Sequence, residues 1–428
     1  MQERFKKAEI IALHIGDFPA HHGTVSINSG KPDDIQKFLE THIPETNTDR
    51  IRIIEWRPSL NYYRESYAKL LSQVVQYIKR TDAVERTTAA FGKRWVRNFF
   101  KNIENIKDCL LYKETSVPVI ITGSGPSLEK ALPVIKNAQN RCLIIAASSS
   151  LTALYHNSIC PDFIIATDGG SWALRHLYSR FRGKTLNETP SLALNLCAAL
   201  PSQCASLRKL IINDGSLWQS IVLHKLALAS VIIPQRGTVT ASAVDLALIL
   251  SGGNIYLAGM DFSFADIMTH VKPYNFDSLF WEQANRFTPF YSEIFSRSFL
   301  MSQGGSMDIY ASWFKNQLDV WEKRIFYLGG SKLFNNGETL LESYLKSRGE
   351  SKNLKNNFKT AGIKKTSSSL CEDGIQSLLC ALKEPQYADK LKEELTALLF
   401  PREKTASEQD IKSALNEIAH NTRKASYG

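Results

Sequence analysis

The sequence has no run of apolar residues long enough to cross a membrane, which needs about 20 in succession. Its most apolar stretch, residues 241–260, is interrupted by Asp245 and by a Gly-Gly-Asn turn at 252–254. The first ten residues lack the apolar core and the small-residue cleavage site of a secretory signal. We therefore expect no membrane span and a cytoplasmic location.

Recognisable metal-binding and disulfide patterns are also missing. None of the seven cysteines forms a Cys-x-x-Cys pair, and several lie in apolar runs, where a thiol behaves as a small hydrophobe. The nine histidines show no His-Glu-x-x-His or similar spacing. These absences fit a reduced compartment and predict no structural metal. They also give no reason to expect a tightly bound cofactor, and no ligand spacing indicates a Mg²⁺ site.

Composition predicts a globular protein with a real core, since 43% of the residues are apolar and 22% are charged. At 428 residues the chain exceeds one ordinary domain. The formal net charge of +10 suits an anionic partner such as a sugar nucleotide. Part of the excess lies in lysines between 352 and 365, where a solvated linker explains it as well. No nucleic-acid-binding motif accompanies it, so we expect no nucleic-acid partner.

The chain divides by pattern into four parts. We expect a small N-terminal α/β region over 1–90, a Rossmann-like catalytic domain over 91–345, a polar linker over 346–370, and a helical region over 371–428.

Several finer expectations follow within these parts. Strands are predicted near the start (IIALHIG) and at 51–56 (IRIIEW), with a polar, turn-rich stretch between them at 21–31. Helical periodicity covers 62–106, and a further helix is expected around 311–326. The aromatic, turn-rich residues 265–310 suit a lid or substrate loop.

The middle of the chain alternates short, wholly apolar runs with helical segments. This pattern indicates an α/β fold with a doubly wound, mostly parallel sheet that is covered on both faces. Such folds bind ligands at the carboxyl ends of their strands. The expected strands are 117–122, 142–148, 162–167, 191–196, 209–214, 230–233 and 254–259.

The first candidate site is the turn GSGPS after the first of these strands. Gly123 and Gly125 allow close backbone approach, Pro126 stiffens the turn, and Ser127 is placed to cap the next helix. With Ser124 they would face a phosphate at the helix N-terminus. The turn is neither the dinucleotide fingerprint nor a P-loop, because the third glycine and the Gly-Lys-Ser/Thr signature are missing. A purely structural tight turn would have the same sequence.

Two further candidates also follow apolar strands. Asp168 and Gly169 end FIIATDGG, where a carboxylate meets a ribose, a sugar or a metal, or else caps its own turn. Arg236, Gly237 and Thr238 open another helix, where Arg236 would pair with a phosphate or carboxylate. A surface arginine and an ordinary N-cap are the alternative.

The fourth candidate follows NIYLAG. Asp261 lies at the end of this strand, and His270 comes nine residues later. A histidine has a pKa suited to taking a proton from an attacking hydroxyl, although a loop histidine without such a role is also common. The argument for a site is that four strand ends with polar residues would face one crevice.

These segments together resemble the motility-associated factor (Maf) flagellin glycosyltransferases, over roughly residues 90–345. The central domain of that family is grouped with pterin diphosphokinase-like (MptE-like) proteins and is similar to bacterial sialyltransferases. The resemblance is carried by GSGPSL (123–128), PDFIIATDGG (161–170), RGTVTASAVDLAL (236–248) and IYLAGMDFSFAD with the later His270. RWVRNFFKNI (94–103) and ASWFKNQLD (311–319) look like the family's flanking helices. The segment between Asp261 and His270 departs from the family's usual Gly- and Lys-containing turn.

The resemblance implies a cytoplasmic, inverting glycosyltransferase. It would transfer a nonulosonic acid (pseudaminic, legionaminic or sialic-acid-like) from its CMP form to Ser or Thr of flagellin, in support of flagellar assembly and motility. His270 would be the base and Asp261 would orient the reacting groups. The nucleotide and donor would be held by the turn residues Gly123, Ser124, Gly125, Pro126 and Ser127, by Asp168 and Gly169, and by Arg236, Gly237 and Thr238.

Two other functions remain open from the sequence. A pterin diphosphokinase-like enzyme would transfer pyrophosphate from ATP and would need Mg²⁺ held by carboxylates such as Asp168 and Asp261. A non-catalytic protein would instead keep the sheet and bind flagellin through its terminal regions.

Overall fold

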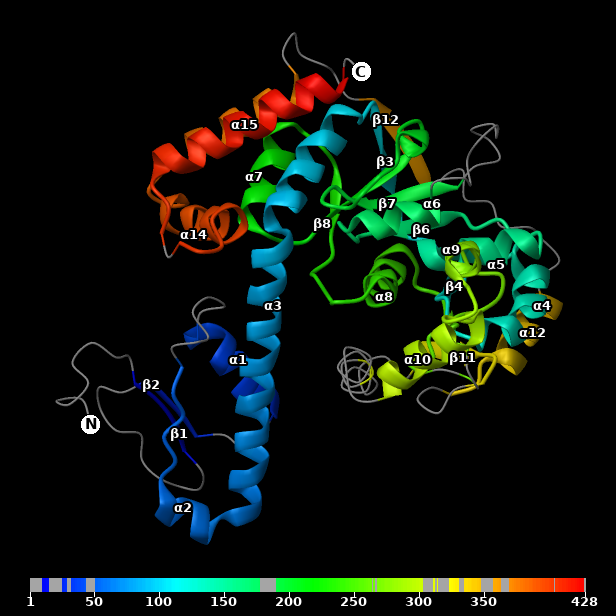
Figure 1. The fold of residues 1–428 in the computed structure, drawn as a ribbon, viewed down its shortest axis with the longest axis horizontal. Helices are drawn as coiled ribbons and strands as arrows, with labels where there is room; N and C mark the ends of the chain where they lie inside the picture. The colour runs from blue at the N-terminus through cyan, green and yellow to red at the C-terminus, as the bar shows by residue number, and fades with distance from the viewer. Residues whose placement is uncertain are drawn as a thin grey trace. The chain divides into compact units, whose positions relative to one another are not determined.

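The structure is a computed structural model. It describes residues 10–14, 25–28, 32–43, 51–177, 190–263, 265, 268–302, 311, 314, 323–330, 335–347, 357–362, 369–403 and 405–426. The chain forms two compact units (Figure 1). Unit 1 comprises Met1–Gly92 and Thr396–Ala406, and unit 2 comprises Lys93–Leu395 and Ser407–Gly428.

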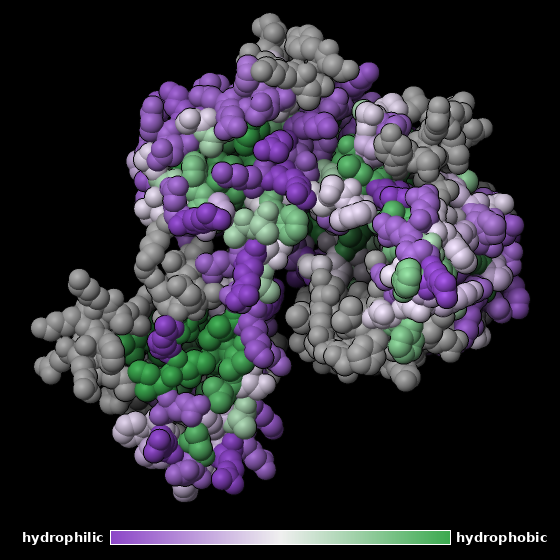
Figure 2. All heavy atoms as spheres, in the orientation of Figure 1, coloured by the Kyte–Doolittle hydropathy of each residue, from purple (hydrophilic) through white to green (hydrophobic). Residues whose placement is uncertain are grey.

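Unit 1 is a small α/β unit, as expected from the sequence. It holds the parallel pair β1 (Ile11–His14) and β2 (Val25–Asn28) and the helices α1 (Pro32–His42) and α2 (Arg57–Tyr62), together with the first part of the 41-residue helix α3 (Arg64–Glu104). Apolar side chains of α1 pack against those of α3 in one cluster. Figure 2 shows apolar residues gathered over the strands and helices of this unit on the side in view.

Residues 51–56 do not form the predicted strand. They have no regular secondary structure, and Ile54 and Trp56 are 61% and 67% exposed. The ladder partner of β1 is β2, which lies in the stretch expected to be polar turns. Strand propensity reflects a fit to a half-buried pleated surface, and residues 51–56 lack that surface here.

Unit 2 is built on one eight-stranded sheet in which every neighbouring pair is parallel. The predicted Rossmann-like α/β fold is thereby confirmed. In order across the sheet the strands are β11 (Ile325–Leu328), β10 (Ile255–Ala258), β4 (Val119–Thr122), β5 (Leu143–Ala147), β6 (Phe163–Ala166), β7 (Ser191–Asn195), β8 (Lys209–Asn213) and β9 (Ser230–Ile232).

The strand order places a topological switch between β4 and β10. From β4 the chain adds strands in one direction as far as β9, then returns to pair β10 with the other side of β4. Ligands of open α/β sheets bind outside the carboxyl ends of the strands at such a point. The turns after β4 and β10 therefore occupy the expected position for a site.

Helices connect these strands and cover the sheet (Figure 1). Helix α8 packs on β4, β5, β6 and β10, and seven of its residues are buried, which explains why it is apolar nearly all round. The α-helices described between β4 and the C-terminal region, α8 included, are α4 (Leu128–Ala138), α5 (Leu151–His156), α6 (Leu174–Leu177), α7 (Leu217–Lys225), α8 (Val239–Leu250), α9 (Asp277–Gln283), α10 (Phe290–Ser302) and α12 (Glu338–Ser347).

Besides β2, three strands lie outside the predicted set. The segment expected to be helical around 311–326 is helical at 311 and 314 but ends in the edge strand β11. The expected linker contains β12 (Phe358–Gly362), which pairs antiparallel with β3 (Asp108–Tyr112). Strand β12 lacks the continuous apolar run that marks the central strands, whereas the apolar run of β11 begins at the end of the segment that was expected to be helical.

The C-terminal region is helical, as predicted, with α13 (Leu370–Ala381), α14 (Ala388–Leu399) and α15 (Glu408–Ser426). Helix α13 packs against α7 and α15. Among the described residues, no helix is long and apolar enough to cross a bilayer.

Candidate functional site

The turns after β4 and β10 are in direct contact. Gly123 N–H donates to the carbonyl of Ala258 and Gly125 N–H to that of Gly259, each at 2.8 Å. A Cβ on Gly123 would lie 2.3 Å from the Gly259 carbonyl oxygen, and one on Gly125 would lie 2.1 Å from Oδ2 of Asp261. Gly259 itself has a φ of +68°, which favours glycine. Glycine is thus required at these three positions, because the backbone of the turn after β4 lies directly against that of the turn after β10.

The carboxylate of Asp261 lies at the N-terminus of α4. Its Oδ2 accepts from Ser127 N–H at 3.0 Å. The side chain of Ser127 makes no capping bond, contrary to expectation, and its Oγ lies 3.0 Å from the hydroxyl of Tyr327 on β11. The positive end of the helix dipole favours a negative charge, and the Asp261 carboxylate supplies that charge here. A phosphate at this helix end would have to displace it, and the nucleotide-binding role of Gly123–Ser127 stays a prediction.

The hydroxyl of Tyr327 connects the turns after β4 and β10 by hydrogen bonds. It accepts from Met260 N–H at 2.8 Å and donates to Oδ1 of Asp261 at 3.3 Å. Burial, and then the neighbouring Asp261 carboxylate, raise the pKa of Tyr327. The phenol therefore stays protonated and holds the carboxylate in place. Sequence inspection missed this residue because it lies on the unpredicted strand β11.

The carboxylate of Asp168 is exposed beyond β6. Its Oδ1 accepts from Gly170 N–H at 2.7 Å, so the side chain caps its own turn. This is the structural role that the sequence analysis gave as the alternative to ligand binding. The charge of Asp168 also acts on His176 of α6, which the sequence analysis did not single out. Burial lowers the pKa of His176 to about 4, and Asp168 opposes this only in part. His176 is therefore a neutral imidazole at neutral pH.

The carboxyl half of α3 fixes the loops after β6 and β7. A Cβ on Gly169 would lie 2.4 Å from Cδ1 of Trp95, so Gly169 is required by this packing. Asn98 Nδ2 donates to the carbonyls of Gly169 and Cys197 at 3.3 and 3.0 Å. Asn102 holds two more carbonyls of the second loop. The segment 94–103 therefore positions loops at the carboxyl ends of the strands.

His270 lies beside the turn after β4. The next residue, Val271, donates its N–H to the Ser124 carbonyl at 2.9 Å. The His270 ring stacks on Tyr274 with centroids 4.1 Å apart, and its Nδ1 is 2.9 Å from Oγ1 of Thr269. The segment carrying His270 is thereby fastened to the end of β4.

The loop after His270 also contacts the helices that follow β5 and β6. Tyr274 and Phe276 lie 5.6 and 5.1 Å from the ring of His176. Asn275 donates to the His176 carbonyl at 3.2 Å and accepts from the hydroxyl of Thr152, on the helix after β5. Residues 270–276 therefore connect the turn after β4 with the helices that follow β5 and β6.

Arg236, Gly237 and Thr238 follow the edge strand β9 rather than the strands at the switch. Arg236 Nε forms an ion pair with Oδ2 of Asp245 at 2.6 Å. Thr238 is the N-cap of α8, where its Oγ1 accepts from Ala241 N–H at 3.0 Å. These contacts secure the start of α8, and a role in binding phosphate or carboxylate stays a prediction.

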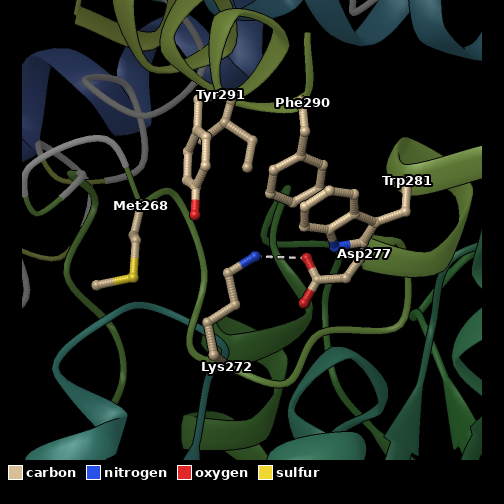
Figure 3. Close-up of a pocket in the computed structure, with 7 residues that line it drawn as sticks. Met268, Lys272, Asp277, Trp281, Phe290 and Tyr291 are labelled. Atoms are coloured by element: carbon tan, nitrogen blue, oxygen red, sulfur yellow. Dashed lines mark hydrogen bonds and ion pairs between the residues drawn. The ribbon is translucent and has the colours of Figure 1, made fainter. Parts of the chain in front are cut away.

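A cavity of about 280 Å³ adjoins the His270 loop. It lies within the aromatic stretch expected to act as a lid or substrate loop, and Figure 3 shows its residues. The lining residues are Met268, Lys272, Asp277, Trp281, Phe290, Tyr291 and Ile294.

Among solved structures, the chain is similar to a Maf glycosyltransferase from Magnetospirillum magneticum AMB-1, with a TM-score of 0.51 and 13% identity over 93% of this chain and 64% of that one. The chain has the Maf glycosyltransferase fold. The resemblance noted in the sequence is thus confirmed at the level of the fold. The family model described as "6-hydroxymethylpterin diphosphokinase MptE-like" matches residues 93–266, less than half of the chain.

Two uncharacterised proteins of Treponema pallidum (strain Nichols) are also similar. One is 25% identical over 282 residues, covering 65% of this chain and 60% of the relative. The other is 28% identical over 133 residues, covering 30% of this chain and 62% of the relative. The chain spans less than two thirds of the length of each of these three proteins.

Proposed function

We propose that the protein is a cytoplasmic glycosyltransferase that transfers a nonulosonic acid from its CMP-activated form to Ser or Thr hydroxyls of flagellin, in support of flagellar assembly and motility. The observation that carries this proposal is the shared Maf glycosyltransferase fold. The contact between the β4 and β10 turns at the topological switch supports it further, because folds of this kind bind ligands there.

In the proposed reaction the acceptor oxygen attacks the anomeric carbon of the donor. The bond from that carbon to the CMP phosphate breaks and CMP leaves with the electron pair, with inversion, by analogy with inverting glycosidases. His270 takes the proton of the acceptor hydroxyl. If Nδ1–H donates to Thr269 Oγ1, Nε2 is the nitrogen that accepts this proton.

Tyr274 and the neutral His176 would form one wall of this site. Both rings lie at the carboxyl ends of the strands, and Tyr274 contacts both histidines. Asp168 would offer its exposed carboxylate to a hydroxyl of the donor. Asp261 would hold the β4 turn in shape through the N–H of Ser127.

A thermal-shift titration with CMP, CMP-N-acetylneuraminic acid, ATP, and ATP with Mg²⁺ tests the proposal. A ligand that binds only the native state stabilises it by about 2.7 kcal/mol at 100 times its dissociation constant. We expect both CMP compounds to raise the melting temperature without metal. Transfer to flagellin should then be lost in His270→Ala, with flagellin binding retained.

The match to the MptE-like family model favours a second candidate, a diphosphokinase-like pyrophosphate transfer from ATP. Stabilisation by ATP with Mg²⁺ alone would replace the glycosyltransferase with this function. Flagellin binding without a response to any nucleotide would instead indicate the non-catalytic alternative.

A further inference from the structure

Lys272 extends into the cavity described above, where it is held by Asp277 (Figure 3). The Nζ–Oδ1 distance is 2.5 Å, and Oδ2 of the same carboxylate accepts from Tyr274 N–H at 2.9 Å. The ammonium also lies over the ring of Phe290, 5.8 Å from its centroid. Asp277 is thus anchored to the backbone and fixes the position of the ammonium.

The ammonium has spare capacity for a ligand. A lysine carries three N–H donors and no acceptor. Within the described part of the chain, Asp277 takes one of them, and the side chain of Lys272 remains 37% exposed. A ligand group that fits here is an oxygen acceptor, and best of all an anion, because hydrogen bonds between charged groups are the stronger ones.

The rest of the cavity is aromatic and aliphatic. The rings of Trp281 and Phe290 stack with centroids 4.0 Å apart, yet Trp281 and the neighbouring Tyr291 are 58% and 65% exposed. Met268 and Ile294 complete the apolar lining. Aromatic faces beside one fixed cation suit a ligand with C–H-rich faces and one acidic group.

The volume of the cavity limits the size of the ligand that it can bind. Ligand sites for drug-sized molecules span about 300–1,000 Å³, and this cavity holds about 280 Å³. It therefore suits a monosaccharide rather than a complete nucleotide sugar.

We propose that this cavity binds a monosaccharide carrying a carboxylate, with Lys272 pairing with the carboxylate and the aromatic side chains packing against the ring. The identification of the ligand as a sugar rests on the proposed function, whereas the preference for a carboxylate rests on Lys272. In a 2-keto acid sugar the carboxylate is bonded to the anomeric carbon. Lys272, two positions after His270, thus sets where the reacting carbon lies and is a specificity-determining residue.

Ligand-observed NMR titrations with N-acetylneuraminic acid and its methyl ester test this proposal without any nucleotide. The ester keeps the ring and removes the charge. A lost hydrogen bond to a charged group costs roughly 1.5–3 kcal/mol. We therefore expect the wild-type protein to bind the acid at least about tenfold more tightly than the ester.

Substitutions test separately how the charge of Lys272 and the aromatic lining contribute to binding. Lys272→Met should abolish the preference for the acid, and Lys272→Arg should retain it. Lys346→Met, on the exposed last turn of α12, is the matched control and should behave as wild type. Trp281→Ala should weaken the binding of both probes and leave their ratio unchanged, which keeps the proposal testable if Lys272→Met does not fold.

Equal binding of the two probes by the wild-type protein, no binding of either, or a preference that survives Lys272→Met would overturn the proposal. Its failure is distinguishable from that of the proposed function. An enzyme that uses a CMP donor with the same KM in Lys272→Met keeps the function and loses this site. A protein that selects the acid through Lys272 but ignores CMP keeps the site and loses the function.

Discussion

The hydroxyl of Tyr327 connects groups from three strand ends with one side chain. It contacts Ser127 after β4 and both Met260 and Asp261 after β10, while Tyr327 itself lies on β11. Each of these residues lies far from Tyr327 in the sequence. The shape of the candidate site at the β4 turn therefore depends on a residue that has no motif of its own.

Tyr327→Phe should lower the free energy of unfolding by about 1–3 kcal/mol, because it leaves the buried N–H of Met260 without its acceptor. Urea unfolding followed by circular dichroism measures the change. Tyr112→Phe makes the same substitution on β3, where the side chain is 40% exposed, and should have little effect. A loss in Tyr327→Phe as small as the one expected for Tyr112→Phe would show that the Tyr327 hydroxyl is dispensable.

His176 should make the stability depend on pH. Its pKa is about 4 in the folded protein and about 6.5 when unfolded, so the folded protein binds a proton at His176 less tightly than the unfolded chain does. A lowered pKa contributes stability in full above pH 6.5, and this contribution is lost as the pH falls toward 4. From the shift we expect a loss of roughly 3 kcal/mol over that range.

Melting temperatures at pH 7 and pH 4 check this expectation. The decline should be smaller in His176→Asn than in the wild-type protein. His156→Asn alters an exposed histidine of α5 and should leave the decline unchanged. A decline in His176→Asn as steep as in the wild type would assign the pH dependence to other groups.

Among the elements, α3 positions the site because two of its side chains bind the loops after β6 and β7. The amide of Asn102 is buried and donates to the carbonyls of Leu196 and Ala198 at 2.8 and 2.9 Å. Asn98 does the same one turn earlier for Gly169 and Cys197. Side chains four residues apart lie on the same face of a helix, so this spacing presents both amides to the loops.

Asn102→Ala should cost about 2 kcal/mol, since two hydrogen bonds are lost. Hydrogen exchange should become faster at the amides of Ala198 and Ala199, which close the loop after β7. Asn105→Ala is the matched control, because the side chain of the exposed Asn105, just after α3, donates to the carbonyl of Lys101 on the last turn of the helix. Unchanged exchange in Asn102→Ala would mean that α3 does not hold the loop.

The elements that could be predicted from the sequence are strands that are buried throughout and helices with a regular apolar period. Strands β5, β7 and β8 are buried at every position, and their runs of apolar residues were recognised. Helix α3 was predicted from its periodicity. The edge strand β11 and the small strands β2, β3 and β12 were missed, because a short or half-exposed strand is stabilised by its ladder partner rather than by its own residues.

At the scale of the whole molecule, the topological switch decides which candidate residues lie near each other. The turns after β4 and β10 meet because these two strands are neighbours, although more than 130 residues separate them. Arg236, Gly237 and Thr238 also follow a strand, but that strand is at the sheet edge. The single crevice expected from four strand ends was an inference about strand order, which hydrophobic patterns do not encode.

The sequence by itself determined the α/β class, the central strands and the polar residues at their carboxyl ends. These follow from local burial periodicity and from the chemistry of single side chains. Only the tertiary structure decided that the Asp261 carboxylate lies at the start of α4, that His176 is partly buried and neutral, and that Lys272 points into an aromatic cavity. The first two depend on which distant segments become neighbours, which strand order settles, and the third depends on how the segment 268–294 packs on itself.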